Sequence, residues 1–146
     1  FNPHFNKTRL ESALTEAGVS YRFFGDRLGG KPDEPRFYDP EGHVLYGFLS
    51  RSPHFLLGID ELLALAGRQR TALMCAEENP SVCHRRLLVT PVLLLRGLTV
   101  LHIRRDASLI GEDNLRRLET GDQPSLFDHL SDSAWKSPQP IRRPKK

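Results

Sequence analysis

The sequence has 146 residues, of which 38% are hydrophobic, and this length and apolar content predict one domain with a single buried core. Its net charge of +3 at pH 7, with a pI near 9.1, is compatible with an anionic partner but is too small to predict nucleic-acid binding by itself. No apolar run reaches the length of a membrane span and two cysteines are too few for a disulfide framework, so we expect a cytoplasmic protein with free thiols.

Two helices and one strand are predicted in the first half of the chain. Apolar residues recur at helical spacing over Asn6–Ala17 and again over Pro53–Ala66, where Ser52 is a suitable N-cap and a glycine follows each run. Val19–Phe24 is rich in β-branched and aromatic residues, which predicts a strand. The glycines, prolines and acidic residues of 25–43 predict a long loop, and such loops in compact domains often carry function.

A strand–helix–strand unit is predicted in the second half. The apolar runs Thr71–Cys75 and Leu98–Ile103 predict two buried strands, and the stretch Ser81–Arg96 between them has room for one helix. Pro91 lies inside that helix, where it lacks a backbone N–H and should kink the axis. Strands joined by a crossover helix pair in parallel, so we expect an α/β fold with a mainly parallel sheet flanked by helices.

The C-terminal part of the sequence loses this alternation. Residues 111–121 predict one short surface helix, whereas the proline, lysine and arginine content of residues 136–146 is typical of a flexible end. We therefore expect a single α/β domain over residues 1–120, followed by a flexible tail over residues 121–146.

Both cysteines of the chain lie around one predicted strand-to-helix turn, in the stretch MCAEENPSVCHRRLL, residues 74–88. In open α/β folds such turns form the ligand sites, and the free amide donors of a helix start favour an anion. Cys83 lies in the predicted first turn beside His84 and Arg85, and a helix start with a neighbouring cation lowers a thiol pKa. The pattern predicts an anion- or nucleotide-binding site with a reactive thiol.

The roles of the two thiols stay open. Cys83 could attack a substrate, or Cys75 could be the nucleophile or the resolving partner, with Glu77 and His84 as proton carriers. Each residue taken alone is also compatible with a structural role, because free cysteines are often small buried hydrophobic residues and neighbouring arginines often form a solvated face.

A zinc site is a further alternative, because Cys75, Cys83, His84 and a carboxylate are suitable ligands. A helix that spans Cys83 and His84 would direct these adjacent side chains apart, which argues against shared coordination. We therefore expect neither a metal nor another cofactor.

Two stretches carry a family resemblance over roughly residues 1–103. MCAEENPSVCHRRLL, followed after one helix by GLTVLHI, resembles the signature of domain of unknown function family 488, and YRFFGDRLGG resembles the element that precedes it there. The resemblance implies an α/β fold with a mainly parallel sheet and no assigned activity. Members usually begin with a strand and a helix that carry a Gly-His-Ser turn and an Asp-Val-Arg element. This sequence lacks both, so we expect either that it is a piece of a longer chain or that the first strand is absent.

The matched motif carries over a set of candidate site residues. The candidates for catalysis are Cys75, Glu77, Cys83, His84, Arg85 and His102. The candidates for substrate binding are Leu28, Gly29, Gly30 and Arg86. His102 could instead be a hydrogen-bonded core histidine at a strand end, and the two glycines could simply permit a tight turn.

The predicted tail contains a second motif. QPSLFD, residues 123–128, is similar to the peptide by which bacterial proteins dock on the replication sliding clamp, with Gln123 at the pocket rim and Leu126 and Phe127 as apolar anchors. Pro124 departs from the leucine that is usual at its position. The alternative is that Leu126 and Phe127 cover the domain's own core.

Two functional hypotheses follow. The first is a thiol-dependent anion- or nucleotide-binding protein, which as an enzyme would act on a phosphate-bearing or nucleic-acid-derived substrate. The second is a non-catalytic accessory factor of DNA replication or repair that docks on the sliding clamp through residues 123–127, with the basic residues 141–146 adding contacts to phosphates. The residue types identify neither a substrate nor an oligomeric state.

Overall fold

The computed structural model describes residues 5–120 and 134–141, and it shows helices with one small antiparallel sheet. The elements follow in the order α1 (Lys7–Glu16), α2 (Tyr46–Leu49), α3 (Pro53–Ala66), α4 (Thr90–Leu95), β1 (Leu101–Ile103), β2 (Leu109–Gly111) and α5 (Glu112–Thr120). Short 3-10 turns lie at Pro35–Phe37 and Pro80–Val82, and a π-helical turn at Arg85–Val89 leads into α4. Within the described ranges, no helix combines the length and the apolar character needed to cross a membrane.

The caps that the sequence offers define α1 and α3. α3 covers its predicted range, and it begins where the Ser52 side chain accepts a hydrogen bond from the amide of Phe55. α1 begins where the Asn6 side chain accepts an amide hydrogen bond, and it ends before Gly18, whose φ of 70° suits glycine. Both helix predictions are confirmed, as is the short helix predicted within residues 111–121, which is α5.

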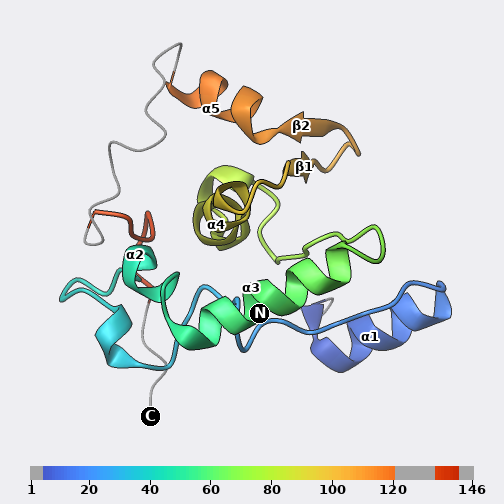
Figure 1. The fold of residues 1–146 in the computed structure, drawn as a ribbon, viewed down its shortest axis with the longest axis horizontal. Helices are drawn as coiled ribbons and strands as arrows, with labels where there is room; N and C mark the ends of the chain where they lie inside the picture. Colours follow the sequence, from blue (N-terminus) through green and yellow to red (C-terminus); the bar gives the residue numbers. More distant parts are fainter. Residues whose placement is uncertain (1–4, 121–133, 142–146) are drawn as a thin grey trace.

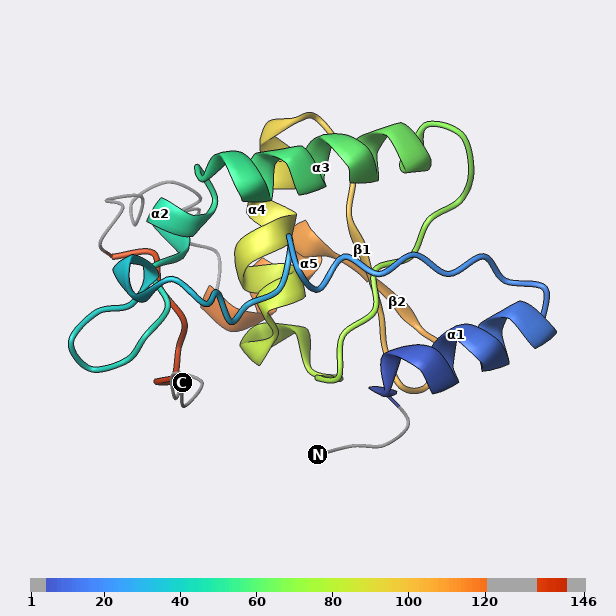
Figure 2. The same ribbon diagram turned by 90° about the horizontal axis from the view of Figure 1, so that it is seen from below.

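The core lies where α3 crosses the helical segment that ends in α4, as the two ribbon views in Figures 1 and 2 show. α3 contributes Phe55, Ile59 and Leu62. The π-helical turn and α4 contribute Leu88, Val89, Val92 and Leu93. The long loop and α2 close this core with buried aromatic residues, whereas α1 has no buried residue and lies outside it.

The prediction of a mainly parallel sheet is wrong, because the fold is mixed α/β and the strands paired within residues 5–120 and 134–141 form one antiparallel hairpin. Of the strand predicted at Leu98–Ile103, β1 is present, and it pairs with β2. Val19–Phe24 and Thr71–Cys75 are irregular chain without strand pairing in the described residues. The physical reason is that an apolar run does not identify its partner, and a strand that follows after a short turn pairs at a lower loop-closure cost than a distant one.

The predicted helix Ser81–Arg96 is interrupted near the cysteines. Cys83 has extended backbone, with φ −93° and ψ 130°, and the chain becomes helical again only from His84 onward. Pro91 lacks the amide that would bond the Leu87 carbonyl, and the indole Nε1 of Trp135 donates to that carbonyl at 2.8 Å instead. The disturbance expected from the proline therefore takes the form of a π-helical turn and an external donor.

Residues 134–141, which the sequence places in a flexible tail, pack against the domain. The Val44 amide donates to Ser137 Oγ at 3.0 Å, and the Ser137 amide donates to the Val44 carbonyl at 2.9 Å. Trp135 packs against the core cluster, and the backbone of Lys136 forms an isolated antiparallel β-bridge with that of Leu45. The expectation of a flexible tail is wrong for this segment, because its proline and lysine content does not show that Trp135 and Ser137 have partners in the domain.

Candidate functional site

Four side chains of the predicted turn converge on one point. The Sγ atoms of Cys75 and Cys83, a carboxylate oxygen of Glu77 and a ring nitrogen of His84 lie within 4.8 Å of one another. Cys75 Sγ donates to Glu77 Oε2 and lies 3.5 Å from His84 Nδ1, while Cys83 Sγ lies 3.9 Å from Glu77 Oε2. Cys83 is fully buried, Cys75 and His84 are half-buried, and Glu77 is exposed. Both thiols are free, and we call these four residues the thiol cluster.

The local backbone explains this convergence. The Asn79 side chain accepts a hydrogen bond from the Ser81 amide and fixes the turn between the two cysteines. Cys83 is extended and His84 is helical, so the side chains of these consecutive residues both reach toward Cys75. The argument that one helix would direct Cys83 and His84 apart is therefore wrong, because Cys83 precedes the helix.

Several amides around the start of this helix already have partners within the protein. The amides of Ser81, Cys83 and Arg86 are hydrogen-bonded to oxygens of the turn itself. These three amides are therefore not available for the anion site expected from the sequence, and the guanidinium of Arg85 is the positive charge that lines the pocket.

Hydrogen bonding within the cluster separates the pKa values of the two thiols. The pKa of Cys83 is lowered to about 7, chiefly because its thiolate accepts a hydrogen bond from Cys75, and also through the amide and charge of Arg85, against the effect of burial. The pKa of Cys75 is raised by the same hydrogen bond and by burial. Burial alone would raise the pKa of Glu77, but the hydrogen bond from Cys75, the Glu77 backbone amide and the charges of His84 and Lys31 together outweigh it and lower that pKa.

A small pocket lies beside the cluster, and His84 is common to both. Its volume is about 80 Å³, and its lining residues are Phe24, Gly25, Leu28, Gly29, Leu73, Met74, His84, Arg85 and Val89. The predicted substrate-binding loop therefore reaches this place, since Leu28 and Gly29 line the pocket. Gly30 lies against His84, because a Cβ atom at Gly30 would be 2.6 Å from the His84 Cβ atom.

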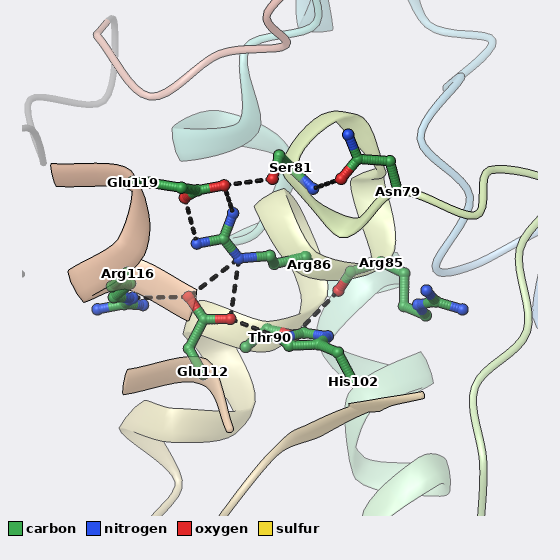
Figure 3. Close-up of polar contacts among 9 residues, drawn as sticks. All are labelled: Asn79, Ser81, Arg85, Arg86, Thr90, His102, Glu112, Arg116 and Glu119. Carbon is green, nitrogen blue, oxygen red and sulfur yellow. Dashed lines mark hydrogen bonds and ion pairs between the residues drawn. The ribbon is translucent and has the colours of Figure 1, made fainter. Parts of the chain in front are cut away.

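The two consecutive arginines have different surroundings (Figure 3). Arg85 lines the pocket and donates to the Leu73 carbonyl at 3.3 Å, and no carboxylate in the described part of the chain pairs with it. Arg86 is 6% exposed and donates to Glu112 and Glu119 at 2.7–3.1 Å. Arg86 is therefore bound by protein carboxylates and does not line the pocket.

His102 belongs to the Arg86 group and not to the thiol cluster. It is 3% exposed, and its Nε2 lies 2.6 Å from Glu112 Oε2. Arg116 donates to Glu112 and the Ser81 hydroxyl to Glu119, so this group joins α5 to β1 and to the turn before α4 (Figure 3). His102 thus has the surroundings of a hydrogen-bonded core histidine, the alternative that the sequence left open.

Residues from distant parts of the chain complete the site and were missed by sequence reasoning. Tyr46 in α2 is buried, and burial together with the charges of the thiol cluster raises the pKa of its hydroxyl, which places it within electrostatic range of that cluster. Phe24 lines the pocket. No local sequence signal connects Tyr46 or Phe24 to the cysteines, because only the fold brings them together. The predicted partner-binding residues Gln123, Leu126 and Phe127 lie outside the described residues.

Comparison with known proteins gives a family match. The sequence model described as "Domain of unknown function DUF488" matches residues 1–91, more than half of the 146 residues. The matched range includes the thiol cluster, the pocket and both arginines, and it ends before His102. No curated protein and no solved structure matches the chain.

Proposed function

The chain belongs to the DUF488 family of domains of unknown function, as its motifs predicted, and we propose that it binds the anionic group of a phosphate-bearing, nucleotide-like ligand in the pocket beside His84 and Arg85. One observation carries the proposal: His84 lines the pocket while its Nδ1 lies 3.5 Å from the Sγ atom of Cys75. A ligand in the pocket is therefore within reach of the thiol cluster. The activity that we propose is thiol-dependent chemistry on this bound ligand.

The positive charge at the pocket supports an anionic ligand. Arg85 is partly buried there, with the Leu73 carbonyl as an acceptor and no carboxylate partner in residues 5–120 and 134–141. A guanidinium has five N–H donors in a planar fork that suits a carboxylate or a phosphate. Arg85 therefore has donors left for an anion, whereas the donors of Arg86 are taken by two glutamates.

The apolar lining supports a ligand with a nonpolar part next to its anionic group. Phe24, Leu28 and Met74 are the larger apolar side chains around Arg85, and Met74 is 53% exposed. Pockets that enclose whole small molecules measure about 300–1,000 Å³, whereas this pocket measures about 80 Å³. It therefore holds one end of the ligand, and the base or sugar of a nucleotide would lie on the exposed apolar rim.

Replacing Arg85 by glutamine is expected to weaken binding of phosphate and nucleoside monophosphates by roughly 10- to 100-fold, because a hydrogen bond to a charged group contributes about 1.5–3 kcal/mol. Isothermal titration calorimetry measures this change. Arg68→Gln is the matched control, since Arg68 is an exposed arginine that does not line the pocket. No binding by the unmodified protein, or an equal loss in both variants, would contradict the proposed site.

We propose docking on the bacterial sliding clamp as a second candidate function, on the basis of the sequence motif. Its residues Gln123, Leu126 and Phe127 lie between α5 and the packed segment 134–141, so the motif is attached to the domain on both sides. A short peptide with an aromatic anchor is a common docking element in protein recognition.

Phe127→Ala is expected to abolish retention of the clamp on the immobilised protein, because it removes the aromatic anchor of the motif. A pull-down with purified bacterial clamp measures retention. Phe48→Ala, which changes an exposed phenylalanine in α2, should leave retention unchanged. Equal retention by the Phe127→Ala variant and the unmodified protein would exclude this candidate.

A further inference from the structure

We propose that the thiol cluster, Cys75, Glu77, Cys83 and His84, is a binding site for Zn²⁺. Its four donor atoms lie within 4.8 Å of one another and follow the spacing Cys-x-Glu-x5-Cys-His. Two sulfurs, one imidazole nitrogen and one carboxylate oxygen make a complete tetrahedral set of zinc ligands. This inference goes beyond the proposed anion binding, because it gives these four side chains a ligand of their own.

The distances in the cluster suit a tetrahedral ion. With zinc–sulfur bonds of about 2.3 Å and zinc–nitrogen bonds of about 2.0–2.1 Å, a sulfur and a nitrogen on the same ion lie about 3.6 Å apart. The Cys75 Sγ and His84 Nδ1 atoms are 3.5 Å apart, and the Cys83 Sγ and Glu77 Oε2 atoms are 3.9 Å apart. These two pairs therefore already have nearly the separations that a zinc ion would impose, whereas the directly hydrogen-bonded Cys75 and Glu77 would move apart when the ion binds.

The backbone holds the four donors from two sides. Cys75 and Glu77 come from the irregular chain before the Asn79 turn, and Cys83 and His84 come from the junction at which the helix begins. Close packing of Gly30 against His84 fixes the position of the imidazole.

The charges of the cluster call for a cation. Cys83 is 0% exposed and faces a carboxylate and a second sulfur. No lysine or arginine of the described ranges forms an ion pair with Glu77. Placing a carboxylate and two thiols together, one of them fully buried, is unfavourable in their ionised forms unless an opposite charge accompanies them, and a divalent ion supplies that charge.

The ligand types select zinc over harder cations. Mg²⁺ and Ca²⁺ bind mainly oxygen ligands, whereas thiolates and imidazole suit Zn²⁺. Glu77 is the exposed ligand, so it is the one that water or an incoming group would replace. Catalytic zinc sites keep three protein ligands and one exchangeable position. In the proposed function, the two thiols would then be needed because they hold the zinc ion.

Metal titration of the chain tests the proposal. The reduced protein is freed of metal with a chelator, titrated with Co²⁺ as a spectroscopic probe, and then titrated with Zn²⁺. We expect one Co²⁺ per chain, with the charge-transfer absorption of thiolate-bound cobalt and the spectrum of a tetrahedral site, both removed by Zn²⁺. Absence of thiolate charge-transfer absorption in the unmodified protein would overturn the proposal, and this reading needs no variant.

Two neighbouring glutamates locate the site. Glu77→Gln is expected to lower the affinity for Zn²⁺ by at least about 10-fold, whereas Glu78→Gln should leave it unchanged, because Glu78 binds Arg104 and the Arg105 amide instead. Equal zinc affinities of these two variants would overturn the assigned ligand set. Arg85→Gln should bind zinc normally while losing phosphate, so that failure of the metal site and failure of the anion site are distinguished.

Discussion

Replacing Arg86 by methionine is expected to lower the free energy of unfolding by about 3–5 kcal/mol, as measured by urea denaturation. The variant removes the guanidinium that binds Glu112 and Glu119, and it leaves Glu112, which is 5% exposed, with only Arg116 and His102 as partners. A buried charge that loses one of its main partners costs more than the attraction itself contributes. Methionine keeps much of the apolar stem of Arg86, so the change reports mainly on charge.

Arg85→Met is the matched control, because Arg85 precedes Arg86 and has no carboxylate partner in the described structure. We expect this control to lose less than about 1 kcal/mol. Adding Glu112→Gln to Arg86→Met should recover part of the loss, because it removes the charge that was left behind. Equal losses from the two arginine variants would contradict a stabilising role for the glutamates.

The loss in free energy of unfolding caused by Arg86→Met should be smaller at acidic pH. Burial alone would raise the pKa values of Glu112 and Glu119, but their hydrogen bonds with Arg86 and other partners outweigh burial and hold both values below the usual range. A carboxyl whose pKa is depressed in the folded state stabilises the fold above its unfolded pKa, near 4.3, and this contribution is lost as the pH falls through the folded pKa. The difference in free energy of unfolding between Arg86→Met and the unmodified protein should therefore have its full value at pH 7 and decrease below about pH 4.

Gly30→Ala should disrupt the site through the position of His84. The new Cβ atom would lie 2.6 Å from the His84 Cβ atom and 3.2 Å from its Nδ1, so the imidazole must shift from its present place, 3.5 Å from the Cys75 sulfur. We expect a loss of about 1–3 kcal/mol in the free energy of unfolding, typical of overpacking. Because His84 belongs to both the pocket and the thiol cluster, calorimetry and metal titration should both show weaker binding.

Gly67→Ala is the control for this prediction. Gly67 follows α3, has a φ of −70°, and an added Cβ atom there would have its nearest neighbour, the Leu63 carbonyl oxygen, at an ordinary 3.5 Å. This substitution should leave phosphate binding unchanged and alter the stability only slightly. If Gly30→Ala binds phosphate and metal like the unmodified protein, the loop does not position His84.

Elements that depend on local interactions were predictable from the sequence. α3 has its predicted range because the Ser52 cap, Pro53 and the glycine at 67 act within one turn of the helix ends. The sheet was not predictable in the same way, since β1 has an apolar pattern but its pairing depends on which other segment lies nearest in space. The packing of Trp135 could not be predicted either, because its partners, such as Leu87 in the π-helical turn, are far from it in the sequence.

The candidate site shows the same contrast between local features, which the sequence predicts, and long-range contacts, which it does not. Cys75, Glu77, Cys83 and His84 lie within one short stretch, so a single turn was enough to predict their proximity. The sequence did not predict that the four side chains point toward one centre, because this depends on the extended backbone at Cys83. The structure places Arg86 and His102 with the glutamates of α5 instead, and nothing in the cysteine motif indicates those partners.

The hydrogen bond from the Trp135 indole shows that the folded domain extends beyond the residues that match the family. The family match stops at Pro91, the residue that cannot supply a donor to the Leu87 carbonyl. The donor that replaces it belongs to a part of the chain that the family boundary leaves out. A piece cut at that boundary would keep both sulfurs, yet it would lose Val92–Leu95 from the end of the helical segment beside them and the Trp135 donor to the Leu87 carbonyl.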